Sequence, residues 1–180
     1  MRKIILAVVV AGMILMTGCV SLLSLSPLAT GDNVIFDPAV VGAWMDDMDG
    51  KETYLIVPDG DKAYEVVYTS KGDPALKFQG SLVDVNGIRI LDLQSRPTID
   101  DFSIPGHFFA HVRVEGDSLY VAFMESRWIR EQVKRERLGM DLSSDRVVLT
   151  ASSEELGSFV ARHAGDPEAF NEEGKLRRIR

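Results

Sequence analysis

The chain contains very little cysteine and histidine, which restricts the chemistry available to it. Its 180 residues include one cysteine and three histidines. A single thiol forms no disulfide within the chain, so no disulfide framework explains this fold. The sequence also lacks a Gly-x-Ser-x-Gly turn and a phosphate-binding loop. We therefore expect a protein that is not an enzyme and that needs no cofactor or metal.

Basic residues are outnumbered as well. The chain has 20 Lys and Arg against 27 Asp and Glu, a net charge of −7. Phosphate binding requires a basic surface, so nucleic acid is a poor candidate for a partner. The length is that of one domain, which is large enough to bury a core without disulfides or metal.

The first residues have the layout of a secretory signal peptide. Arg2 and Lys3 precede an uncharged apolar run over 4–16, and small residues follow. The stretch Met16-Thr17-Gly18-Cys19 resembles the lipobox of bacterial lipoproteins. In that family the cysteine sulfur receives a diacylglyceryl group, the peptide is cut before the cysteine, and the new amine is often acylated, for example with palmitate. The resemblance implies lipidation at Cys19.

The N-terminal motif also predicts the organisation and location of the protein. We expect a signal peptide over 1–18, a lipidated tether over 19–36 and a folded domain over 37–180. An uncleaved membrane helix over 4–28 is the alternative, although Ser21, Ser24, Ser26 and Pro27 interrupt it. Both place the domain outside the cytoplasm. Val20 stands where enteric lipoproteins retained at the inner membrane have Asp, which favours the outer membrane if the source has two.

Alternating apolar residues predict seven β-strands between residues 40 and 124. Asn86-Gly87 and Gly116-Asp117 are typical of the tight turns of hairpins. Several strands are apolar on both faces, as expected of a barrel wall covered by helices or of a tightly packed core. The predicted strands are 40–46, 52–58, 62–69, 75–85, 88–94, 107–115 and 118–124.

The pattern changes after residue 124. A helix is predicted over 126–138 with Ser126 as its cap, and another over 152–165 with a capping box of Ser152 and Glu155. A short strand over 146–150 separates them, and 174–180 reads as a frayed basic tail. The fold class is therefore mainly β: a small antiparallel meander barrel with two C-terminal α-helices.

Gly42-Ala43-Trp44 opens the first predicted strand and resembles the Gly-x-Trp signature of lipocalins and related small barrels. In that family the glycine lets the chain pass closely into the barrel floor and the tryptophan plugs it. An arginine late in the domain packs on the indole; Arg127, Arg146 or an arginine of the tail is available here. A buried core tryptophan after a flexible glycine is the plainer alternative.

Alternation also gives candidates for the barrel interior, and with them two hypotheses for function. One is a binding module for a hydrophobic small molecule or acyl chain; the other is an envelope protein with a solid barrel that contacts another envelope component. The candidates for lining the interior are Tyr54, Ile56, Tyr64, Val66, Tyr68, Phe78, Phe108 and Val112.

Three weaker candidates have plain alternatives. His107 and His111 lie about 13 Å apart if they share a strand, too far for one metal ion. Asp46, Asp47 and Asp49 lack the full calcium-loop pattern and read as a solvated turn, while Asp100 and Asp101 read as loop polars. The helix over 126–138 has a basic side, for which we weighed docking on anionic headgroups against a solvated face balanced by Glu131 and Glu136.

Overall fold

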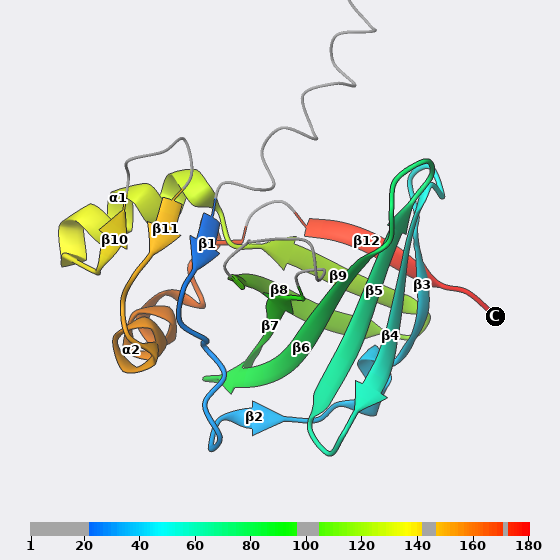
Figure 1. Ribbon diagram of the computed structural model, residues 1–180, viewed down its shortest axis with the longest axis horizontal. Helices are drawn as coiled ribbons and strands as arrows, with labels where there is room; N and C mark the ends of the chain where they lie inside the picture. The colour runs from blue at the N-terminus through cyan, green and yellow to red at the C-terminus, as the bar shows by residue number, and fades with distance from the viewer. Residues whose placement is uncertain (1–21, 97–104, 142–146, 171–172) are drawn as a thin grey trace, which may run out of the picture.

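The computed structural model describes residues 22–96, 105–141, 147–170 and 173–180, so Cys19, Asp100, Asp101 and Arg146 lie outside the described part. Its body is a closed antiparallel barrel of eight strands with two helices (Figure 1), which confirms the predicted fold class. In order around the barrel the strands are β3 (Gly42–Asp46), β4 (Glu52–Asp59), β5 (Ala63–Ser70), β6 (Leu76–Val85), β7 (Ile88–Ser95), β8 (His107–Glu115), β9 (Ser118–Phe123) and β12 (Glu173–Arg178).

Strands β3 to β9 are the seven predicted from the sequence, and consecutive ones pair with each other. Asn86 and Gly87 both have positive φ, 54° and 84°. A two-residue turn with this geometry matches the twist of the strands it joins, which is why Asn-Gly is favoured there. The first strand begins at Gly42 rather than Val40, because Pro38–Val40 forms a short 3-10 helix, η1, started by Pro38 and capped by Asp37.

The basic C-terminal segment is not a frayed tail, as the sequence predicted, but β12, the strand that closes the barrel. Leu176 lies opposite Leu119 of β9 and Asp46 of β3. On the outer side Lys175 and Arg177 approach Asp47, at 3.3 and 3.6 Å. The sequence pattern did not predict this strand because Leu176 is its single large apolar residue. Pairing with the edges of β3 and β9 fixes the position of the strand.

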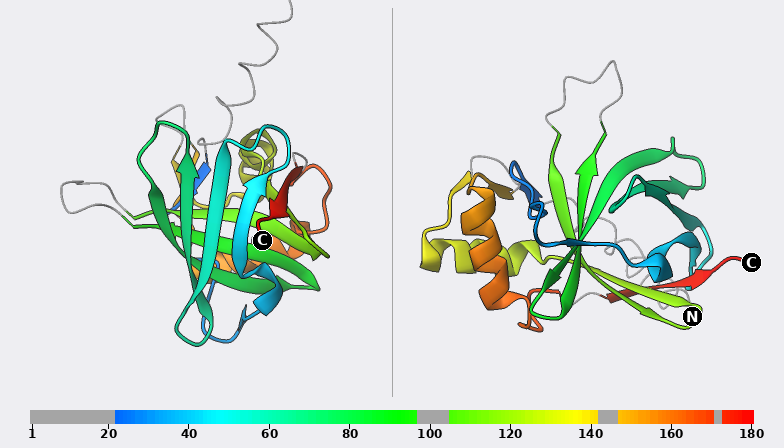
Figure 2. Two further views of the ribbon diagram at one scale, coloured as in Figure 1. Left: turned by 90° about the vertical axis from the view of Figure 1, so that its right-hand side faces the viewer. Right: turned by 90° about the horizontal axis from the view of Figure 1, so that it is seen from below.

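Two separate hydrophobic cores explain why several strands are apolar on both faces. One fills the barrel interior and includes Trp44, Tyr64 and Leu82, which are fully buried. The other lies outside the wall, where Val83, Ile90 and Phe109 of the barrel meet the helices. Figure 2 shows both helices on one side of the barrel. Of the two explanations the sequence left open, the helix-covered wall is therefore confirmed.

The helices are α1 (Ser126–Glu136) and α2 (Ser153–His163). The capping box at α2 is confirmed, since Ser152 accepts from the backbone N–H of Glu155 and the Glu155 carboxylate accepts from that of Ser152. The cap predicted for α1 is wrong. Ser126 is the first helical residue and Glu125 precedes it, without a side-chain capping bond among the described residues.

The segment before the barrel packs against the domain, which corrects the predicted tether over 19–36 in its described part. Strand β1 (Leu22–Ser24) pairs in parallel with β11 (Val147–Leu149) and touches β8, while β10 (Met140–Asp141) adds to β11. Further along, β2 (Val34–Ile35) pairs with β6. Leu28 is buried, so apolar side chains hold this segment down despite its serines. Because Leu22–Ser24 is a β-strand and 25–28 are not helical, the alternative membrane helix does not extend over 22–28.

Candidate binding site in the barrel

The closed end of the barrel is built by Trp44 and Arg178. The Arg178 Cζ lies 4.0 Å from the centroid of the Trp44 ring. Its guanidinium donates to the carbonyl oxygens of Val41 and Ala39, at 2.7 and 2.8 Å, and the indole N–H donates to that of Val40, at 2.9 Å. These bonds fasten η1 across the end of the barrel. The arginine left open by the sequence is thus in the tail, on β12.

Gly42 has a steric reason to be glycine. Its φ is +152°, a conformation that residues with a side chain rarely adopt. A Cβ built there would lie 2.3 Å from Nη1 of Arg178, well inside contact distance. The absence of a side chain at Gly42 therefore leaves the space that the guanidinium fills, and the Gly-x-Trp pattern and the C-terminal arginine form one unit.

Tyr64 also belongs to the closed end rather than to an open interior. Its ring is fully buried and stacks on Phe36, with centroids 5.2 Å apart. Its hydroxyl oxygen accepts from the backbone N–H of Asp37 at 2.7 Å. Burial raises the pKa of this phenol, so the group stays neutral at physiological pH. Tyr64 therefore holds Phe36 and Asp37, which lead into η1, by stacking and a hydrogen bond.

A small cavity of about 40 Å³ remains inside the barrel. Its described walls carry aliphatic and aromatic side chains from η1 and six of the barrel strands. Phe123, at the end of β9, is the most exposed of the wall residues, with 39% of its surface exposed, while Tyr54 and Val121 are partly exposed. The lining residues are Val40, Tyr54, Ile56, Val66, Leu91, Leu93, Val112, Leu119, Val121, Phe123 and Leu176.

The aromatic residues predicted to line the interior lie close together, but most of them pack on one another. Tyr54 lines the cavity and packs on Tyr68, with ring centroids 5.1 Å apart. Phe78 meets Phe108 edge-on at 6.3 Å. Tyr68, Phe78 and Phe108 flank the cavity without being among its walls. Burial and the nearby Glu52 raise the pKa of Tyr54, so its phenol adds no charge to the wall.

Among the predicted aliphatic residues, Ile56, Val66 and Val112 do line the cavity. Other wall residues were not predicted from the sequence: Leu91 and Leu93 on β7, and Leu119 and Val121 on β9. Their alternation along the strands was visible and would have placed them on one face. Alternation does not show which of the two apolar faces of β7 points into the barrel, because helices cover the other face.

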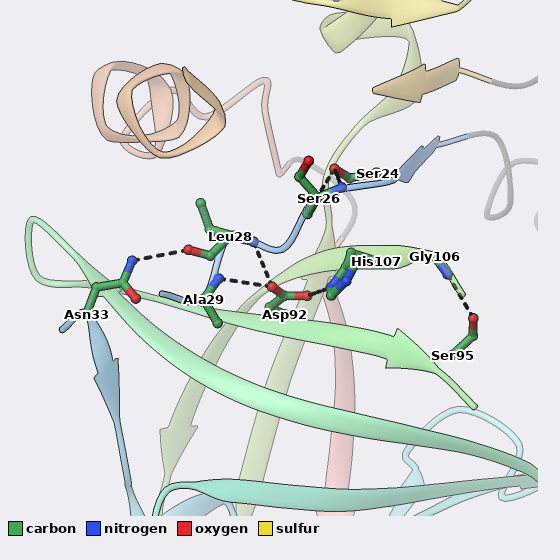
Figure 3. Close-up of polar contacts among 9 residues, drawn as sticks. All are labelled: Ser24, Ser26, Leu28, Ala29, Asn33, Asp92, Ser95, Gly106 and His107. Atoms are coloured by element: carbon green, nitrogen blue, oxygen red, sulfur yellow. Dashed lines mark hydrogen bonds and ion pairs between the residues drawn. The ribbon is translucent and has the colours of Figure 1, made fainter. Parts of the chain in front are cut away.

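A buried polar pair lies on the outer side of the wall, where the sequence predicted ordinary histidines. The Nδ1 of His107 is 2.7 Å from one carboxylate oxygen of Asp92 (Figure 3). The other oxygen accepts from the backbone N–H groups of Leu28 and Ala29, at 2.8 and 3.0 Å. Asp92 and His107 are 3% and 8% exposed. This pair ties the N-terminal segment to β7 and β8.

The remaining candidates have structural partners. His111 shares β8 with His107, and burial lowers its pKa. Asp46 accepts from the backbone N–H groups of Met48 and Asp49 in the turn after β3. Within the described residues, no group of three or more His, Cys, Asp or Glu is placed to hold a metal ion.

The fold and its closed end define a class: a small closed antiparallel β-barrel, consistent with a lipocalin-like fold. Comparison with known proteins gives no matching family model, no matching curated protein and no matching solved structure. Neither α1 nor α2, nor any other helix in the described part of the chain, has the length and apolarity to span a bilayer.

Proposed function

We propose that this protein is a non-enzymatic, extracytoplasmic lipoprotein whose barrel binds a hydrophobic small molecule or acyl chain. The observation that carries the proposal is the cavity, whose described walls are apolar and whose most exposed wall residue is Phe123. An apolar site of this kind favours a ligand without charge in its buried part, because an unpaired charge there would be strongly destabilised.

Binding of an acyl chain requires the cavity to widen. At about 40 Å³ it has room for small groups only. The side chains that have to move are those at the end opposite η1, where Phe123 is partly exposed and Tyr54 packs on Tyr68. The floor around Trp44 is held by hydrogen bonds and stays in place. The ligand therefore enters from the Phe123 end and reaches no further than Val40 of η1, which lines the cavity at the floor.

A fluorescence titration tests this proposal. Trp44 and Trp128 are the two tryptophans, and Trp128 lies in the outer core, so Trp128→Phe leaves Trp44 as the reporter. Palmitate added to this variant is expected to change the emission of Trp44 saturably, with about one ligand per chain and micromolar affinity. Adding the substitution Val112→Leu to this variant is expected to narrow the cavity and abolish the change in Trp44 emission. The matched control Val57→Leu, on the outer side of β4, leaves it intact.

The proposed location depends on the N-terminal motif. Lipidation of Cys19 would hold the domain at the outer face of a membrane, the outer membrane if the source has two. Two or more acyl chains give a stable anchor, whereas one binds marginally. Mass spectrometry of protein isolated from membranes is expected to find residues 1–18 missing and a diacylglyceryl group added. A full-length, unmodified chain would rule this part out.

A second candidate function is favoured by the small size of the same cavity. A barrel packed nearly solid would serve as a rigid structural or interaction module of the cell envelope, with a protein partner on its outer surface. The titration separates the two proposals. No response of Trp44 to palmitate, combined with specific crosslinking to an envelope protein in intact cells, would support the solid barrel.

A further inference from the structure

Helix α1 carries a row of basic side chains along one side. Arg127, Arg130 and Lys134 are spaced three and four residues apart, which places them on one face of the helix. We call these three residues the basic face. Trp128, Ile129 and Val133 are the buried residues of α1. The row is about 11 Å long at 1.5 Å per residue.

One of the two acidic residues of α1 is occupied elsewhere. Glu136 turns toward α2, where it pairs with Arg162 and His163. These partners, Arg162 first, lower the pKa of Glu136, so it remains ionised in that pairing. Among the described residues no carboxylate forms an ion pair with Arg127 or Lys134. Glu131, four residues after Arg127 and three before Lys134, is the acidic residue of α1 at helical spacing from both, so this side of α1 has more basic than acidic groups.

The chain enters the domain next to this helix. Leu22, the first residue of β1, lies in the same buried cluster as Trp128, Ile129 and Val133 of α1. In Figure 1, α1 lies near β10, β11 and β1 at the left-hand side of the molecule, away from the C-terminus. Cys19 precedes Leu22 by three residues, and three residues span at most about 11 Å. A lipid on Cys19 therefore keeps the bilayer surface within about that distance of Leu22, which belongs to the same buried cluster as α1.

We propose that the basic face of α1 docks on the anionic headgroups of the membrane to which Cys19 is anchored, a proposal that rests on the location proposed above. Each basic residue near such a surface adds about fivefold to the docked-to-undocked ratio. Docking turns α1 toward the membrane. It also gives the Phe123 end of the barrel a fixed orientation relative to the membrane. The occupant is a lipid surface, since a tether this short presents α1 to the bilayer before any soluble anion.

The test measures how close α1 lies to lipid in the full, anchored protein. Glu131→Cys places a fluorescent label beside the basic face, because the thiol of Cys19 is blocked when it carries lipid. Vesicles contain either phosphatidylcholine alone or phosphatidylcholine with phosphatidylglycerol, each with a quencher in the headgroup region. We expect quenching in the anionic vesicles that is lost at about 1 M salt, where screening leaves an interaction range of about 3 Å.

Charge reversal identifies the residues responsible. Arg127→Glu with Lys134→Glu is expected to lower the docked-to-undocked ratio at least 25-fold, about fivefold for each charge removed. The matched control, Lys62→Glu with Lys71→Glu, makes the same charge change at exposed turn residues and leaves quenching unchanged. Equal quenching in neutral and anionic vesicles, or an equal loss in the control, would overturn the docking proposal. Failure to float with neutral vesicles would instead refute the lipid anchor.

Discussion

At the scale of single residues, Gly42 is the position with the least freedom. Gly42→Ala imposes a side chain on a backbone with φ of +152° and places its Cβ 2.3 Å from Arg178. We expect a loss of about 2–4 kcal/mol of unfolding free energy, through backbone strain and displacement of the guanidinium. Urea denaturation measures it. Gly31→Ala is the matched control, since no described atom lies within 4 Å of a Cβ added there; an equal loss in both variants would contradict the steric account.

Asp92 carries the second prediction at this scale. Asp92→Ala leaves His107 and the backbone N–H groups of Leu28 and Ala29 without their buried acceptor. We expect a cost of about 3 kcal/mol or more, because buried polar groups lose both water and partner. The exposed Asp61→Ala is the control and is expected to cost about 0.5 kcal/mol or less. Amide exchange at Leu28 and Ala29 should accelerate in the first variant alone; unchanged protection would argue against the pair.

Residue types alone revealed part of these sites. Trp44 after Gly42 indicated a barrel floor, and the structure gives the reason in the shared contacts with Arg178. Asp92 gave no usable signal, because a carboxylate within an alternating strand reads as solvent-facing. Its burial depends on the backbone of Leu28 and Ala29, far away in the sequence, and no local pattern encodes that contact.

At the scale of elements, β12 decides whether the barrel is closed. Leu176 is its main apolar side chain and is 6% exposed. Leu176→Ala is expected to cost about 2–4 kcal/mol, since it removes packing between β3 and β9 and enlarges the cavity. Lys175→Ala, the neighbour that points outward, is expected to cost about 0.5 kcal/mol. Similar small losses in both would show that β12 adds little to closure.

The contact between α1 and α2 has a defined pH dependence. The pKa of Glu136 is lowered from its ordinary 4.5, mainly by Arg162 and also by His163. A lowered carboxyl pKa contributes stability that is complete above the ordinary value and is lost as the pH falls through the folded-state value. Glu136→Gln should therefore lower stability by about 0.5–1 kcal/mol at neutral pH and leave it unchanged in strong acid. A difference that persists in acid would show that charge is not the cause.

The elements also show where sequence reasoning works and where it stops. Strands β3 to β9 were predictable because each is local: alternation gives the strand and an Asn-Gly or Gly-Asp pair gives the turn. β1 and β12 were not, since both pair with strands distant along the chain, β1 has only three residues, and β12 has a single large apolar side chain. Closure of the barrel supplies their partners, and it is a property of the whole sheet.

At the scale of the whole molecule, the two cores have separate tasks. The outer core joins the N-terminal segment and both helices to one side of the barrel, while the interior keeps a cavity. The first strand and helix α1 belong to the side of the outer core. The barrel wall therefore separates the proposed binding site from the side proposed above for membrane attachment.

Calorimetric titration with a long-chain fatty acid, at two temperatures, tests the central claim most directly. The account predicts one site per chain and a negative heat-capacity change, the marker of apolar burial, in the parent protein. Val112→Leu should remove the binding and Val57→Leu should keep it. Absence of binding in the parent, or equal binding in the narrowed barrel, would contradict a ligand site inside this barrel.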